Sequence, residues 1–224
     1  MDILMTALFT AAGAAAGLAA PGAAEAISKY KRKKRGEVLE RDAKYTALWI
    51  KIALGVLSAA VWGSAAFYIE NPVTCVSLVL IFTAAILFTL IDLRIRIVPN
   101  ELILVMLPLG AAFQISHLGI KAIVPAVICM VVMMGVFSIL AGAMGFNKVG
   151  AGDVKLAGVM GLALSYPLVF IALAVMAVLF VVYALGGMAL KKLTLKSMFA
   201  FAPFMMAGLA SALVYVIIQI AHLI

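Results

Sequence analysis

The sequence predicts an all-α, polytopic membrane protein of about eight transmembrane helices. Hydrophobic residues make up 67% of the 224 residues, charged residues make up 12%, and the mean hydropathy is +1.25. Such a composition excludes a water-soluble domain of this length. The apolar residues also fall in runs close to the roughly 20 residues that a helix needs to cross a bilayer. The short alternating runs of a membrane β-barrel are absent from the sequence.

The apolar segments follow one another along the chain with short polar loops between them. The sixth, from Val154 to Ser165, is too short to cross a bilayer alone and stops before Pro167, whose ring cannot continue a helix interior. It therefore starts below the membrane surface or is broken. Asp2 stands where a cleaved signal peptide would carry basic residues, so we expect the first segment to remain as a helix. We expect helices near 3–20, 46–69, 73–92, 101–118, 121–145, 154–166, 167–190 and 197–222.

Basic residues predict the orientation, because lysine and arginine in short loops stay on the cytoplasmic side. All but Lys51 and Lys121 of the 17 lysines and arginines fall in or beside alternate loops. They are Lys29, Lys31, Arg32, Lys33, Lys34, Arg35, Arg41 and Lys44 in the first loop, Arg94 and Arg96 in the third, Lys148 and Lys155 in the fifth, and Lys191, Lys192 and Lys196 in the seventh. Eight crossings then leave both termini outside the inner cell membrane.

The net charge of +8 is explained mainly by this topology and by attraction to anionic membrane lipids. Nucleic acid is not an expected partner. The chain divides into residues 1–45, the first transmembrane helix with a basic cytoplasmic loop, and residues 46–224, the membrane core.

Two aspartates are the candidate functional residues. Asp92 stands at the end of the third segment and Asp153 at the start of the sixth, so the predicted topology places both at the cytoplasmic face. A carboxylate at a membrane boundary is costly enough to indicate function. Because the two residues belong to different helices, their carboxyl groups could meet.

Other catalytic chemistries lack their residues. The only cysteines, Cys75 and Cys129, form no C-x-x-C pair and have no neighbouring histidine, and the only histidines, His117 and His222, lie far from each other and from both aspartates. This excludes a cysteine–histidine zinc site, an H-E-x-x-H metalloprotease and a G-x-S-x-G serine hydrolase, and no cofactor is expected. Paired carboxyl groups remain: one takes a proton from an attacking water while the other donates a proton to the peptide carbonyl.

Glycines surround Asp153. Gly150 and Gly152 are predicted to serve the site, because a residue without a Cβ allows unusual backbone angles and close approach of an extended substrate. More distant glycines at helical spacing are predicted to pack helices together, as in other membrane proteins. They are Gly142, Gly145, Gly158 and Gly161.

Two motifs carry a resemblance to a known family. Residues 92–100 read DLRIRIVPN, an aspartate followed seven positions later by proline and then asparagine, just before the next helix. Residues 150–156 read GAGDVKL, a GxGD sequence followed by a hydrophobic residue and lysine. Together these motifs resemble those of the type IV prepilin peptidases, which are GxGD aspartyl proteases, and the similarity covers roughly residues 75–200.

The resemblance implies that Asp92 and Asp153 are catalytic. The implied substrate is a prepilin or pseudopilin precursor with a basic leader, cleaved at a glycine on the cytoplasmic boundary before its hydrophobic helix. Arg94 and Arg96 could orient the loop, contact substrate or simply mark the cytoplasmic side. Lys155 could act electrostatically on Asp153 or reach the lipid headgroups. The residues expected to bind substrate or shape the site are Gly150, Gly152, Lys155, Pro99, Asn100, Arg94 and Arg96.

The first loop departs from the larger members of the family. Those carry a cytoplasmic domain, often with zinc-binding C-x-x-C pairs, that is associated with methylation of the new N-terminus by S-adenosylmethionine. Here the loop spans only about residues 26–45 and holds no cysteine. The chain therefore resembles a reduced, peptidase-only form.

Two other classes remain open. In a proton- or cation-coupled transporter, Asp92 and Asp153 would relay protons or bind cations. Against this, the sequence shows no inverted repeat, and both residues are predicted at one face and not at the midplane. In a structural scaffold the aspartates would only cap helices. Asp153 suits that role, whereas Asp92 at the end of its helix opposes the helix dipole.

Overall fold

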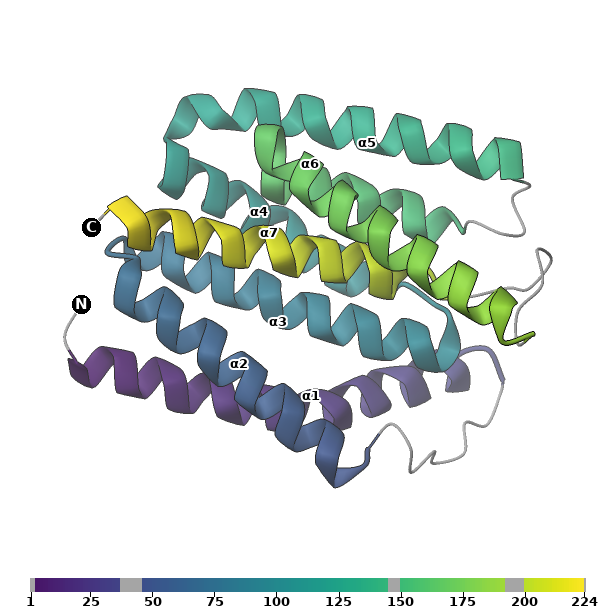
Figure 1. The fold of residues 1–224 in the computed structure, drawn as a ribbon, viewed down its shortest axis with the longest axis horizontal. Coiled ribbons are helices and arrows are strands. Elements are labelled where there is room, and N and C mark those ends of the chain that lie inside the picture. Colours follow the sequence, from purple (N-terminus) through teal and green to yellow (C-terminus); the bar gives the residue numbers. More distant parts are fainter. Residues whose placement is uncertain (1–2, 37–45, 145–149, 192–199, 224) are drawn as a thin grey trace.

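The computed structural model describes residues 3–36, 46–144, 150–191 and 200–223, and over these residues it is all-helical (Figure 1). The α-helices of the described residues are α1 (Ile3–Lys33), α2 (Leu48–Tyr68), α3 (Pro72–Ile95), α4 (Asn100–Leu118), α5 (Ile123–Met144), α6 (Ala151–Ala189) and α7 (Ala202–Leu223). All seven are long and apolar enough to cross a membrane. The predicted all-α membrane fold is confirmed. Part of the basic loop sequence lies outside the described residues, namely Arg41, Lys44, Lys148, Lys192 and Lys196.

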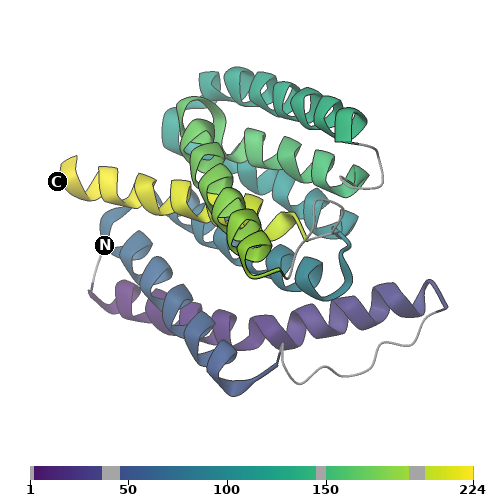
Figure 2. The same ribbon diagram turned by 45° about the vertical axis from the view of Figure 1, so that its right-hand side comes forward.

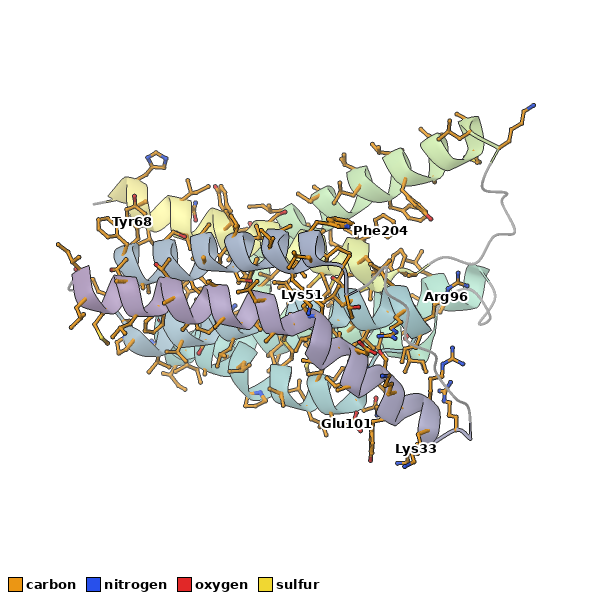
Figure 3. All side chains as sticks on the ribbon, turned by 90° about the horizontal axis from the view of Figure 1, so that it is seen from below. Lys33, Lys51, Tyr68, Arg96, Glu101 and Phe204 are labelled. Atoms are coloured by element: carbon orange, nitrogen blue, oxygen red, sulfur yellow. The ribbon has the colours of Figure 1, made fainter. Side chains whose placement is uncertain are left out.

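The helices lie side by side in one bundle around α3. In Figures 1 and 2, α1 and α2 cover one side of α3, while α5 and α6 lie on the other. Both chain termini lie at the same end of the bundle (Figure 1). Lys33 and Arg96 lie at the opposite end, called the basic end below (Figure 3). This arrangement agrees with an even number of passes, and the placement of both termini outside stays a prediction.

Helix α6 contains two of the eight predicted segments, which is why the described residues form seven α-helices. It leaves helical geometry at Ser165 (φ 55°, ψ −174°) and Tyr166, just before Pro167, where the sequence predicted a break. Tyr166 and Pro167, in the middle of α6, line a cavity with residues from the C-terminal ends of α4 and α7. Tyr183, near the C-terminal end of α6, instead has its ring against Phe204, near the start of α7. The two halves of α6 therefore run in opposite directions (Figures 1 and 2). The predicted sixth and seventh segments are these two halves.

A buried side chain compensates for the break. Pro167 has no N–H group, so the Ala163 carbonyl four residues earlier loses its usual helical partner. The Nε2 atom of buried Gln114 in α4 donates a hydrogen bond of 2.6 Å to that carbonyl. This contact joins α4 to the first half of α6, and at about 1.5 Å per residue that half is only ~21 Å long.

Local sequence accounts for the ends of α3. Pro72 occupies the first turn, where its missing N–H costs nothing, and the Asn71 side chain accepts hydrogen bonds from the amides of Val73 and Thr74. At the other end Arg96 adopts the left-handed conformation (φ 52°, ψ 44°), and its N–H donates to the Asp92 carbonyl at 2.8 Å. Pro99 then precedes α4. The reversal from α3 to α4 is therefore tight, and it spans the first motif.

Two predicted features differ in the structure. Helix α1 does not end near residue 20 but continues through Pro21 to Lys33, because alanine, lysine and arginine are strong helix formers.

The predicted packing role of the more distant glycines holds for Gly158 and Gly161. A Cβ on Gly158 would lie 2.6 Å from Met134 Cγ, and a Cβ on Gly161 would lie 2.8 Å from the Cys129 carbonyl oxygen. Gly142 has open space around it, so its predicted packing role is wrong. Gly145 lies outside the described residues.

Candidate functional site

Asp92 occupies the last turn of α3 and is only 5% exposed. Its Oδ2 atom accepts a hydrogen bond of 3.1 Å from the backbone N–H of Ala202, the first residue of α7. The N-terminal end of a helix carries partial positive charge, so α7 stabilises a carboxylate here. The expectation that capping cannot explain Asp92 is therefore wrong, because in space Asp92 caps α7 and not its own helix.

Asp153 lies in the first turn of α6 and is half-buried. Its Oδ2 atom accepts a hydrogen bond of 3.1 Å from the Gly150 N–H, and its own N–H donates to the Gly150 carbonyl at 2.9 Å. The side-chain bond is one half of a capping box, in which the N3 carboxylate accepts from the N-cap amide, and the backbone bond is an ordinary bond of the first helical turn. Asp153 therefore helps to cap α6 from the N3 position, while Gly150 is the N-cap residue.

The two carboxyl groups lie within electrostatic range of each other at the basic end of the bundle. The charge of Asp153 acts on Asp92, and so does the charge of Arg96. Each carboxyl group uses Oδ2 for its backbone hydrogen bond, and no described residue donates a hydrogen bond to either Oδ1 atom. Two carboxyl groups, each held through one oxygen and with the other open, form an arrangement that can exchange protons with a water molecule.

A side-chain hydrogen bond connects the two motifs. Lys155 Nζ donates to Asn100 Oδ1 at 3.2 Å, which joins the start of α6 to the start of α4. Neither of the two roles that the sequence left open for Lys155 describes this contact, because the acceptor is the side-chain amide of Asn100. Lys155 and Asn100 thus shape the site together.

We expect replacement of either partner to weaken the site modestly. Lys155→Met and Asn100→Leu should each lower the peptidase activity that the two motifs predict by a few-fold, because an exposed hydrogen bond of this kind contributes about 1 kcal/mol. The double variant should be no worse than either single variant. Cleavage rates of the two single variants and the double variant would show this coupling, and additive losses would contradict it.

The two arginines of the first motif have different surroundings. The side chain of Arg94 is 4% exposed, and its Nη2 atom lies 3.7 Å from Glu25 Oε1 in α1. Arg96 is exposed and points away from the bundle (Figure 3), although its charge acts on Asp92. Among the roles proposed from sequence, loop orientation therefore suits Arg94, and substrate contact remains possible only for Arg96. Pro99 is buried and ends the loop before α4.

The glycines beside Asp153 differ in what they require. A Cβ on Gly152 would lie 2.9 Å from Val98 Cβ, so Gly152 lets the start of α6 approach the first-motif loop. Gly150 has ordinary extended angles (φ −76°, ψ 154°), and a Cβ there would meet nothing closer than 3.8 Å. The expectation of unusual backbone angles is wrong for both residues. Close approach is needed at Gly152 alone, and its neighbour is the protein's own loop.

This difference gives a matched pair of variants. Gly152→Ala should separate α6 from the loop and lower both cleavage and thermal stability, since overpacking of this kind costs about 1–3 kcal/mol. Gly150→Ala adds the same methyl group where its nearest neighbours lie at an ordinary contact distance of 3.8 Å, and it should have a clearly smaller effect. Unfolding temperature and cleavage rate, measured for both variants, test the difference. Equal losses would mean that the Val98 contact is not the reason for Gly152.

An apolar cavity lies about one helical turn before Asp92 along α3. It has a volume of about 190 Å³ and opens between α2, α3 and α7. Its lining includes Thr89 and Leu90, about one turn before Asp92, and Pro203, which follows Ala202. An apolar group in this cavity would therefore lie near the Asp92 carboxylate.

Sequence reasoning missed two contributors to this region, Ala202 and Glu25. Pro203 in the first turn marks the start of α7 on the same predicted face as the aspartates. Pro203 thus predicts where α7 starts, but it does not predict that the Ala202 amide at this start contacts Asp92. Glu25 is a single acidic residue between Ala24 and Ala26, and its partner Arg94 is distant in sequence.

Comparison with known proteins identifies part of the chain. The model of the type IV leader peptidase family matches residues 78–185, a segment that contains both motifs and both aspartates. Comparisons with curated proteins and with solved structures gave no match. The resemblance read from the two motifs is thereby confirmed. Residues 78–185, just under half of the chain, are therefore similar to the type IV leader peptidase family.

Proposed function

We propose that this chain is a membrane-embedded aspartic endopeptidase that removes the basic leader from prepilin-like precursors at the cytoplasmic face of the inner membrane. The match of residues 78–185 to the type IV leader peptidase family supports a leader peptidase in general. The observation that carries the aspartic mechanism is that the charge of Asp153 acts on the carboxyl group of Asp92, while a backbone amide holds each carboxyl group through one oxygen.

In the proposed reaction, a water molecule lies between the two carboxyl groups. The ionised carboxylate takes a proton from this water as the water oxygen attacks the scissile carbonyl carbon. At the same time the protonated carboxyl group donates a proton to the carbonyl oxygen. The tetrahedral diol then collapses: one hydroxyl gives its proton to the carboxylate that had protonated the carbonyl oxygen, the C–N bond breaks, and the amine leaves with a proton from the carboxyl group that had taken one from water. Both carboxyl groups thereby return to their starting protonation states. Repulsion between like charges favours the singly protonated pair that this reaction requires.

The surroundings of Asp92 suit a substrate whose hydrophobic helix begins just after the cleaved bond. The apolar cavity beside Asp92 could accept side chains from the start of such a helix. Both carboxyl groups lie at one end of the bundle and not midway along it, which favours a boundary peptidase over a transporter with a midplane site.

Co-expression with a tagged prepilin-like precursor tests the proposal. The precursor should lose its leader, and mass spectrometry should find the new N-terminus next to a glycine at the membrane boundary, without an added methyl group. We expect a zinc chelator to leave the rate unchanged, because the proposed proton transfers use only the two carboxyl groups. Intact precursor in the presence of correctly folded protein would contradict the proposed function.

A further inference from the structure

The last third of α1 forms a charged arm at the basic end of the bundle. At about 1.5 Å per residue, the 31 residues of α1 span ~46 Å, well beyond the ~30 Å of a bilayer's hydrocarbon core. Figure 3 shows α1 changing direction part-way along, and Pro21 is the helix-interior residue that accounts for such a bend. Residues 22–33 beyond the bend, called the α1 arm below, carry Glu25 and Lys31.

The α1 arm contacts both sides of the first motif. Glu25 Oε1 lies 3.7 Å from Nη2 of Arg94, two residues after Asp92. Lys31 Nζ lies 2.6 Å from the carboxylate of Glu101, which follows Asn100 at the start of α4. The two ion pairs therefore bracket the loop that begins at Asp92.

The two ion pairs have opposite polarity. The arm supplies a carboxylate to an arginine at one point and an ammonium to a carboxylate at the other. Sliding or rotating the arm would bring like charges together, so the pattern fixes its register. The side chains of Arg94 and Glu25 are 4% and 12% exposed. Glu25 Oε1 also lies 2.8 Å from Nζ of Lys29 within the arm, so Glu25 keeps a cationic partner when Arg94 is changed. The Arg94 contact is the more buried of the two contacts between the arm and the first motif, and Coulomb attraction is screened less in a buried pair.

We propose that the α1 arm is a positioning clamp for the loop that carries Asp92. Its residues act through the loop and do not touch the substrate. Glu25 and Glu101 are occupied by cations of the chain itself, so neither serves as the anchor for a basic leader. The arm lies outside the segment that matches the peptidase family, residues 78–185. As far as it concerns cleavage, this inference rests on the proposed function.

Charge reversal tests the clamp. Lys31→Glu and Glu101→Lys should each lower kcat for leader cleavage with little change in KM, because a small displacement of a catalytic group costs up to about 100-fold. The double reversal restores the attraction and should recover most of the rate. Glu25→Arg, Arg94→Glu and their combination form the same cycle at the buried pair. Lys33→Glu is the matched control, since it makes the same charge change on an exposed residue of the arm.

A second readout does not depend on cleavage. With Cys75 and Cys129 replaced by alanine, a cysteine placed at Ile97 reports loop accessibility through its alkylation rate. Single reversals at Lys31 or Glu101 should speed alkylation, and the double reversal should slow it again. If the buried pair cannot be reversed without unfolding, the exposed pair still decides the question.

The possible outcomes are distinguishable. If wild-type protein cleaves no precursor, the proposed function fails while alkylation still tests the clamp. The clamp is overturned if single reversals leave both kcat and alkylation at wild-type values. It is also overturned if reversal at Glu101 raises KM alone and Lys31→Glu does not rescue it, since Glu101 would then bind the leader directly.

Discussion

Asp92→Asn is expected to reduce leader cleavage by about 100- to 10,000-fold, the range that a general acid or base contributes. Asparagine keeps a carbonyl oxygen that can accept the Ala202 hydrogen bond, so the start of α7 should stay in place. Asparagine cannot exchange a proton with water, so the contribution of general acid or base catalysis to the cleavage rate should be lost. Cleavage of a tagged precursor, measured together with the unfolding temperature in detergent, separates the two effects.

Asp153→Asn provides the parallel test at the other carboxyl group. The amide oxygen can still accept from the Gly150 N–H, which preserves the cap of α6. We therefore expect a similar loss of cleavage with little loss of stability. Two stable and active asparagine variants would instead support a scaffold in which both aspartates only cap helices.

Ala202→Pro is the second variant with a large expected effect. Proline has no N–H, so it removes the hydrogen bond to Asp92, and it is well tolerated at the first position of a helix. A hydrogen bond to a charged group contributes about 1.5–3 kcal/mol, which corresponds to roughly a 10- to 100-fold lower kcat if it is needed in the transition state. The rate should fall even though the substituted residue lies outside the matched family segment.

Ala202→Ser is the control for this variant, because serine keeps the N–H in the same buried position. It should retain most of the activity, and both variants should retain the helical content of the wild type. Equal rates for the proline and serine variants would show that Asp92 does not depend on the α7 amide.

Much of the fold could be predicted from the sequence because the relevant signals are local. Apolar runs indicated the helices, Pro167 indicated the break in α6, and the two motifs indicated Asp92 and Asp153. The end of α1 was misplaced because the run of apolar residues stops near residue 20, whereas helix propensity continues to Lys33. Hydropathy marks the membrane boundary, and a helix does not have to end there.

The contacts that hold the site could not be predicted in the same way. The partner of Asp92 is an amide 110 residues away, and the partner of Arg94 lies in a helix before the family segment. A backbone donor also leaves no side-chain signal, so Ala202 looks like any other small residue. The two glycines beside Asp153 appear equivalent in sequence, but only Gly152 faces a neighbour, Val98.

The central claim is that Asp92 and Asp153 act as one unit on a single water molecule. The most direct measurement compares leader cleavage by purified, lipid-reconstituted wild type with Asp92→Asn, Asp153→Asn and the double variant. Groups that act as a unit lose their effect together, so each single variant should be about as slow as the double variant. Either single variant cleaving near the wild-type rate, or a double variant slowed by the product of the two single losses, would contradict the claim.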